Sequence, residues 1–158
     1  MLVFAIDPGD RLSAYCLVQT KDYKPVSFGK VENDEIRKIL FTQKADHYVI
    51  ERIRSYGMSV GRDVFETCEW VGRFSEIIFS IGADTQYVYR MEEKTTICHD
   101  SKANDANIRR ALIDQFARFD LRSGKGTKKK PDFFYGFHAD VWAAYSVAYT
   151  FIKTRLEG

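Results

Sequence analysis

The chain opens with a short, continuous apolar run that ends in an acidic residue. Residues 2–6 (LVFAI) precede Asp7, and the turn-forming pair Pro8 and Gly9 follows directly. An apolar run this short, bounded by a turn, is typical of a central strand buried on both faces. A carboxylate at the carboxyl end of such a strand lies where open α/β sheets bind their ligands. Asp7 is therefore the first candidate for a functional residue.

The pattern of the remaining chain predicts a single α/β domain over residues 1–158. We expect strands over 2–7, 13–19, 24–31, 47–50 and 86–90, and helices over 32–42, 61–81, 101–119 (N-capped by Ser101) and 139–155. Short turns join the first three strands, which predicts an antiparallel meander. The fourth strand follows a helix, so it is expected to run parallel in the sheet. This order is that of a ribonuclease H-like fold, a mixed five-stranded sheet flanked by helices on both faces.

Two further acids are expected to converge on Asp7. Glu51 ends the fourth strand, which should lie beside the first, and Asp140 opens the last helix on its sheet-facing side. Three carboxylates suit Mg²⁺ or Mn²⁺, and two such ions can clamp the attacking and leaving oxygens of a phosphodiester displacement. Each acid alone could instead form a turn, end a strand in solvent or cap a helix. Their joint placement is what indicates a metal site.

Basic residues are concentrated in one part of the chain. Residues 101–130 hold nine Lys and Arg against three acids, although the whole chain has a net charge of only +2. Such asymmetry suggests a surface for a polyanion. Five of these residues lie in a glycine-containing segment before the last helix, which is either a phosphate-binding flap or a solvated surface loop: Arg122, Lys125, Lys128, Lys129 and Lys130.

Three segments resemble the RuvC-like Holliday junction resolvases: residues 6–9 (IDPG), 49–51 (VIE) and 138–144 (HADVWAA). Residues 100–114, 126–131 and 135–136 look most similar to the bacteriophage branch of that family. The resemblance covers nearly the whole chain. It implies a Mg²⁺-dependent endonuclease that acts as a homodimer on four-way DNA junctions in recombination or repair. Asp7, Glu51 and Asp140 would then be its catalytic, metal-binding acids, holding two Mg²⁺ ions that Mn²⁺ can replace, with no small-molecule cofactor.

The sequence departs from that family at one position. The family usually has a fourth acid, or a histidine, three residues before the last acid, where this chain has Phe137. His138 is one residue late, and its alternative role is structural or capping. Asp132 and Asp105 are the other candidates for the fourth ligand.

Further residues are candidates for contacts to DNA. Arg52, Arg54 and Tyr56 follow Glu51 directly, and Tyr56 would either stack on an unpaired base or pack in the protein. Lys102 is a candidate for neutralising charge in the transition state. Trp70, Phe74 and Ile78 of the 61–81 helix would contribute either to a dimer seam or to the core.

Other features narrow the class of protein. The three cysteines show no metal-ligand spacing and fit a reducing compartment, no apolar stretch has membrane length, and no targeting peptide is apparent, so we expect a cytoplasmic protein (in the host cytoplasm if phage-encoded). Three alternatives to a resolvase are another ribonuclease H-like nuclease acting on RNA–DNA hybrids or flaps, a catalytically impaired junction-binding module, and half of an actin-like ATPase. The last would need a second domain, for which 158 residues leave no room.

Overall fold

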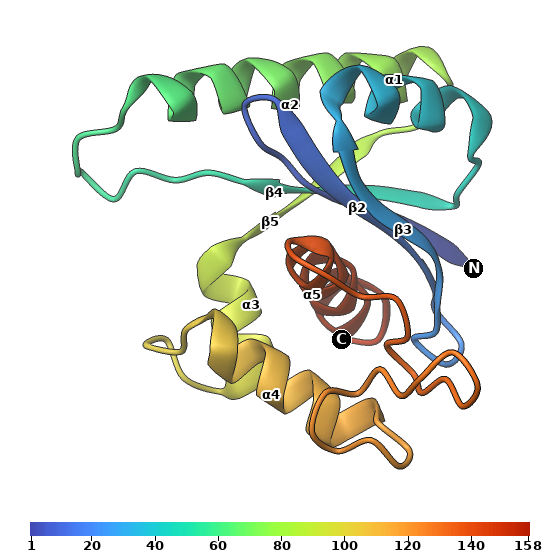
Figure 1. The fold of residues 1–158 in the computed structure, drawn as a ribbon. Coiled ribbons are helices and arrows are strands. Elements are labelled where there is room, and N and C mark those ends of the chain that lie inside the picture. Colours follow the sequence, from blue (N-terminus) through green and yellow to red (C-terminus); the bar gives the residue numbers. More distant parts are fainter.

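The computed structural model describes all residues from 1 to 158 and centres on one mixed five-stranded sheet (Figure 1). The strands lie in the order β3-β2-β1-β4-β5. The first three pair antiparallel, and β1, β4 and β5 run parallel to one another. Their bounds are β1 Leu2–Asp7, β2 Leu12–Gln19, β3 Pro25–Glu32, β4 His47–Arg52 and β5 Thr85–Tyr89. The predicted sheet and its mixed topology are confirmed.

Helices cover both faces of this sheet. In Figure 1, α1 and α2 lie together over one face, whereas α5 packs on the other with α3 and α4 beyond it. The π-helical segment η1 continues α5 to the end of the chain. The bounds are α1 Asn33–Thr42, α2 Arg62–Ser80, α3 Arg90–Cys98, α4 Asp105–Phe116, α5 Val141–Phe151 and η1 Ile152–Leu156.

The alternation of side chains along β1 divides the core into two parts. Phe4 and Ile6 point toward α1 and α2, whereas Val3 and Ala5 point toward α5. Each of these side chains is fully buried, as expected for a central strand covered on both faces. The small side chain of Ala5 lets α5 approach the sheet closely, so that the first residues of α5 lie near the end of β1.

The helices differ from the expectations in two respects, and burial decides between the two expected roles of the α2 side chains. Ser101 does not cap a helix: α4 begins at Asp105, and Asn104 caps it by accepting a hydrogen bond of 2.8 Å from the Asn107 backbone N–H. The helix α3 was not predicted at all. Phe74 and Ile78 are fully buried in the core of this chain, so they cannot form a dimer seam.

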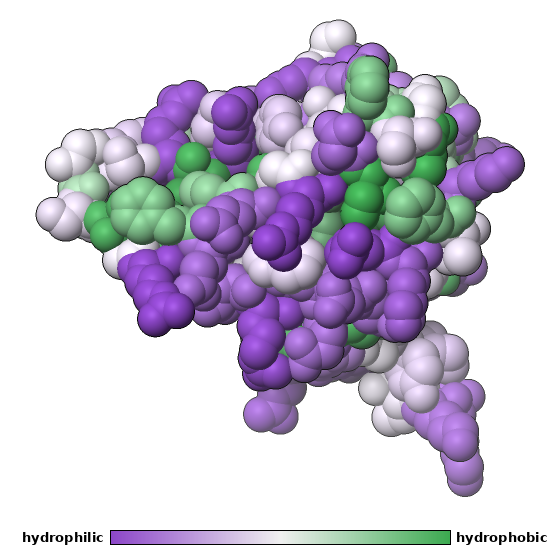
Figure 2. Space-filling model, turned by 90° about the horizontal axis from the view of Figure 1, so that it is seen from above, coloured by the Kyte–Doolittle hydropathy of each residue, from purple (hydrophilic) through white to green (hydrophobic).

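The outer surface over α1 and α2 carries little continuous apolar area. Figure 2 shows a mostly hydrophilic face with smaller hydrophobic patches. Trp70 is half-buried and packs on Phe74, with their ring centroids 5.7 Å apart. None of the helices combines the length and the apolar character needed to span a bilayer.

Candidate functional site

Asp7 and Glu51 lie side by side at one edge of the sheet. Ile6 of β1 pairs with Ile50 of β4, and because the two strands are parallel, the next residue on each is an acid at the same edge. Burial raises the pKa of Asp7 well above its usual value, and the negative charges of Glu51 and Asp140 raise it further. A hydrogen bond with Glu51 acts in the same direction, and the positive charge of Arg90 opposes it only in part. The structure therefore brings the carboxyl groups of Asp7, Glu51 and Asp140 within interaction range.

Asp140 approaches the same edge from the start of α5. It occupies the N-cap position, but its side chain makes no capping hydrogen bond. Instead Oδ2 accepts a hydrogen bond of 2.6 Å from Nζ of Lys30 on β3, and 52% of the side chain is exposed. Ala139, directly before it, has a φ of 45°, a left-handed conformation that costs a non-glycine residue free energy. The turn that presents Asp140 is therefore held by the surrounding packing.

Sequence reasoning missed one acid at this edge. Glu93 lies in the first turns of α3, just after β5, the parallel neighbour of β4. Its side chain is 0% exposed, and Oε1 accepts a hydrogen bond of 3.2 Å from Nη1 of Arg90. Burial is the largest cause that raises the pKa of Glu93 well above its usual value. A hydrogen bond with Glu51 and the charges of Glu51 and Asp7 raise this pKa further. Four carboxyl groups thus interact at one edge.

Position 137, where the fourth ligand was expected, and the neighbouring His138 both have other contacts. Phe137 is 1% exposed, and its ring centroid lies 4.7 Å from that of Phe28 and 5.0 Å from that of Trp142. His138 is exposed, and its Nδ1 lies 3.1 Å from the carbonyl oxygen of Gly136. Position 137 is a core position, and the ring nitrogen of His138 is engaged with the backbone.

Asp132 and Asp105 have other partners as well. The carboxylate of Asp132 accepts hydrogen bonds from the backbone N–H groups of residues 118, 119, 120 and 133, at 2.7 to 3.0 Å. Burial alone would raise the pKa of Asp132, but these hydrogen bonds together lower it to about 2. Asp105 is exposed and forms an ion pair with Arg90. Asp132 therefore orders the loop, whereas Asp105 pairs with Arg90 and lines a small hollow together with Arg90 and Asp140.

Lys102 lies in the exposed turn before α4, and its side chain has no ion pair or hydrogen bond. The backbone N–H of Lys102 donates to Oδ1 of Asp100, at 2.9 Å. The cations that do contact the acids are Arg90 and Lys30.

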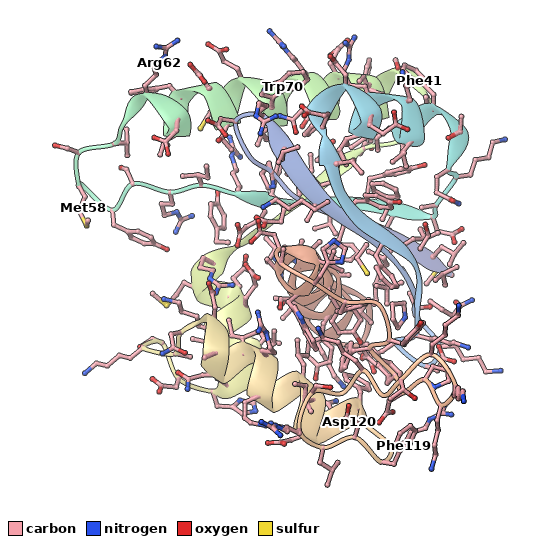
Figure 3. The ribbon with its side chains drawn as sticks, in the orientation of Figure 1. Phe41, Met58, Arg62, Trp70, Phe119 and Asp120 are labelled. Carbon is pink, nitrogen blue, oxygen red and sulfur yellow. The ribbon has the colours of Figure 1, made fainter.

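The loop after β4 carries the predicted DNA contacts and projects away from the sheet. Met58 lies at its far end in Figure 3. The guanidinium of Arg52 lies 4.7 Å from the ring centroid of Tyr87, and that of Arg54 lies 3.9 Å from that of Tyr89. Tyr56 is 59% exposed, so its ring is not packed in the protein. The guanidinium of Arg54 also lies 6.0 Å from the ring centroid of Tyr56, so the end of β4 and this loop present cations together with an exposed aromatic ring.

The basic loop lies at a different place. Phe119 and Asp120 lie just before this loop in the chain. In Figure 3 they are on another side of the molecule from Met58. Arg118 and Pro131 line a hollow together with Asp22 and Lys24 of the β2–β3 turn. Asp7 pairs with Ala14 and Leu2 with Gln19, so that turn is at the opposite end of the strands from Asp7. The five basic residues do not surround the acids; any DNA contact from them is to phosphates farther away.

Hydrogen bonds within the basic loop order it locally. The carboxylate of Asp120 accepts hydrogen bonds from the hydroxyl and backbone N–H of Ser123 and from the backbone N–H of Gly126, which lower the pKa of Asp120 to about 2. Nζ of Lys130 lies 4.4 Å from the ring centroid of Phe119. Lys128 and Lys129 are exposed and form no ion pair.

Two solved structures share this fold over nearly the whole chain. The RuvC structure of Thermus thermophilus matches with a TM-score of 0.72 and 14% identity, covering 99% of this chain and 97% of that one. T. thermophilus RuvC in complex with a Holliday junction substrate matches with a TM-score of 0.70 and 14% identity, covering 99% and 96%. No family model and no curated protein sequence matches the chain. The chain therefore has the ribonuclease H-like α/β fold of RuvC.

The acidic edge fits a divalent cation by its chemistry. Its donors are carboxylate oxygens, which suit Mg²⁺ and Mn²⁺, and Oε2 of Glu93 is buried without a hydrogen-bond partner. As they are placed, no three His, Cys, Asp or Glu side chains form a closed ligand set. Lys30 and Arg90 instead contact Asp140 and Glu93. Binding of a cation would require Asp140 to turn from Lys30 toward the ion, whereas Glu93 can keep its contact with Arg90 through Oε1.

Proposed function

We propose that this protein is a metal-dependent, structure-selective DNA endonuclease that resolves four-way (Holliday) and branched junctions by phosphodiester hydrolysis. The observation that carries the proposal is the convergence of Asp7, Glu51 and Asp140 at one sheet edge of a fold shared with RuvC. Carboxylates gathered at the carboxyl ends of parallel strands cost folding energy, and a cation that binds DNA phosphate would offset that cost. A purely structural role for three mutually repelling acids offers no such compensation.

Asp7, Glu51 and Asp140 would hold two Mg²⁺ ions, or Mn²⁺ in their place. When bound, the ions would supply an activated water and would stabilise the departing 3′ oxygen of the cleaved strand. Asp7 ends the central strand β1, which is paired with β2 on one side and β4 on the other, so its backbone is held firmly in place. Asp140 is held by Lys30 until the site is occupied. By holding the ions, the acids would position the scissile phosphate, and the chain would need no small-molecule cofactor.

DNA would reach the site across two surfaces. Arg52 at the end of β4 and Arg54 in the loop after it follow Glu51 in the chain, and the exposed ring of Tyr56 in that loop could stack on an unpaired base at a junction centre. The basic loop, with Arg122, Lys125, Lys128, Lys129 and Lys130, would contact phosphates of a junction arm farther from the cut. This division assigns specificity to the first loop and affinity to the second.

A homodimer suits this substrate because a four-way junction has approximate twofold symmetry, which a C₂ dimer matches. Two sites related by that symmetry would cut opposing strands. We also propose that the protein acts in the cytoplasm (of the host, if its resemblance to bacteriophage resolvases reflects its origin).

Cleavage of a synthetic four-way junction, with Mg²⁺ or with EDTA and mapped to the nucleotide, tests the proposal. Symmetric nicks on opposing strands, dependent on Mg²⁺ and lost in Asp7→Asn, are the expected result. Full activity of Asp7→Asn would overturn the role of the acids. RNA–DNA hybrids and flaps in the same assay test the alternative of another ribonuclease H-like nuclease.

A catalytically impaired junction-binding module is the second candidate. It is favoured by the absence of a closed set of three metal ligands and by Phe137 in place of a fourth ligand. That candidate predicts tight junction binding in a gel-shift assay without any cut in Mg²⁺ or Mn²⁺.

A further inference from the structure

Position 137, where the fourth ligand was expected, cannot hold an acidic side chain. The side chain of Phe137 is buried between the rings of Phe28 and Trp142. An acid at this position would be an unpaired charge in an aromatic core, which costs several kcal/mol. If the site has a fourth carboxylate, it has to come from another element.

Glu93 is the acid whose environment requires an explanation. It is the only buried residue of α3, and it is 0% exposed although it is ionisable. Oε1 accepts a hydrogen bond of 3.2 Å from Nη1 of Arg90, whereas no donor group reaches Oε2, and the other polar neighbour of the side chain is the carboxyl group of Glu51. A buried carboxylate oxygen without a hydrogen bond is expensive, and a buried ion pair is seldom more stable than an apolar pair of the same volume. An apolar side chain at position 93 would therefore serve the packing of α3 better.

The direction in which Glu93 points supplies that explanation. Glu51 of β4 pairs with Val88 of β5, the strand that leads into α3, and the charges of Glu51 and Asp7 both act on Glu93. Arg90 contacts Oε1 of Glu93 and also pairs with Asp105, so it is anchored from two sides. Oε2 is left without a hydrogen-bond donor.

We propose that Glu93 is the fourth carboxylate of the cation site, supplied from α3 in place of the residue at position 137, and that Arg90 holds it in position. The inference rests on the proposed metal site formed by Asp7, Glu51 and Asp140. It adds the ligand that the sequence lacks at the expected place. The ligand class is a hard divalent cation, Mg²⁺ or Mn²⁺, because every donor is a carboxylate oxygen. Arg90 is a positioning residue, since it contacts the acid and not the ion.

Binding of Mn²⁺ alone, without DNA, tests this assignment. Electron paramagnetic resonance of free Mn²⁺ gives the number of bound ions and their affinity for the wild-type protein and its variants. Glu93→Gln should lose one bound ion or weaken binding at least about tenfold, the effect typical of losing one direct ligand or its support. Glu93→Asp should restore part of the binding because it keeps the carboxylate. Glu76→Gln, an exposed acid of α2 without an ion pair, is the matched control and should bind as the wild type does.

Folding of each variant is checked by thermal melting in EDTA, where Glu93→Gln should melt at or above the temperature of the wild type. Wild-type Mn²⁺ stoichiometry and affinity in Glu93→Gln would overturn the assignment, and so would a wild-type protein that binds no Mn²⁺.

Junction cleavage separates this result from the proposed function. If Glu93→Gln loses Mn²⁺ but the wild type cuts no junction, the ligand assignment stands and the nuclease does not. If the wild type cuts junctions but Glu93→Gln binds Mn²⁺ as the wild type does, the proposed nuclease stands and the ligand assignment does not.

Discussion

The acidic edge should make the metal-free protein less stable as the pH rises, and Asp7→Asn should remove much of that dependence. Asp7 has a raised pKa in the folded state because of burial first and of its acidic neighbours second. Between the unfolded pKa of about 3.9 and the higher folded pKa, the folded protein binds more protons than the unfolded chain. Wild-type stability therefore falls through this range as the pH increases.

The size of the effect follows from proton linkage. One extra proton held by the folded state changes the free energy of unfolding by about 1.4 kcal/mol per pH unit. Between pH 5 and pH 7 the stability of Asp7→Asn should therefore rise relative to the wild type by up to about 2.7 kcal/mol. With a urea m-value of about 2 kcal/mol/M, the difference between the two unfolding midpoints should change by up to about 1.4 M over this range.

Urea unfolding in EDTA at a series of pH values measures this difference. Asp84→Asn, an exposed acid after α2 without an ion pair, is the matched control and should show no such trend. Mg²⁺ at about 100 times its dissociation constant should stabilise the wild type by about 2.7 kcal/mol and Asp7→Asn by less. A stability difference between wild type and Asp7→Asn that is constant from pH 5 to pH 7 would refute the electrostatic reasoning.

Three further predictions concern the loops. Asp132→Ala removes the acceptor of four backbone N–H groups and should lower the free energy of unfolding by about 3 kcal/mol at pH 7, measured by urea unfolding. Because the pKa of Asp132 is lowered to about 2, its stabilisation should persist down to about pH 4 and be lost as the pH falls through 2; equal loss at every pH contradicts this. Replacing Lys128, Lys129 and Lys130 by Ala should reduce the slope of log K against log salt for junction binding by up to about 2.7, and an unchanged slope would exclude phosphate contacts there. Tyr56→Ala should weaken junction binding by about 1–3 kcal/mol without changing the melting temperature, whereas unchanged binding would rule out base stacking.

The strands were predictable because burial shows directly in their side chains. The run from Leu2 to Ile6 forms β1, and the acid after it ends the strand as expected. Asp7 and Glu51 could be placed together because parallel neighbours end at the same edge, a rule that needs only strand order. The antiparallel meander followed from short turns in the same way.

The helix α3 was missed because it lacks the signal that sequence reasoning depends on. Its residues (RMEEKTTIC) show no apolar periodicity, and the only one that is buried is a glutamate. The beginning of α4 was misplaced for a related reason. Ser101 and Asn104 are both good N-cap residues, and only the reciprocal hydrogen bonds of Asn104 and Asn107 decide between them.

At position 137 the family motif predicts a ligand, but the residue found there belongs to the core. A cation site needs carboxylate oxygens at one point in space, and that point is reached from the ends of β1 and β4, from the start of α3 and from the start of α5. The family motif places one acid on the segment before α5. A cation needs a carboxylate close to it, and this need does not depend on which element of the fold carries the acid. Here Phe137 adds apolar burial to the core that holds α5 in position, and Glu93 carries the charge from α3. An acid at position 137 would be buried among aromatic rings, so packing disfavours a carboxylate there and leaves α3 as the element that can supply it.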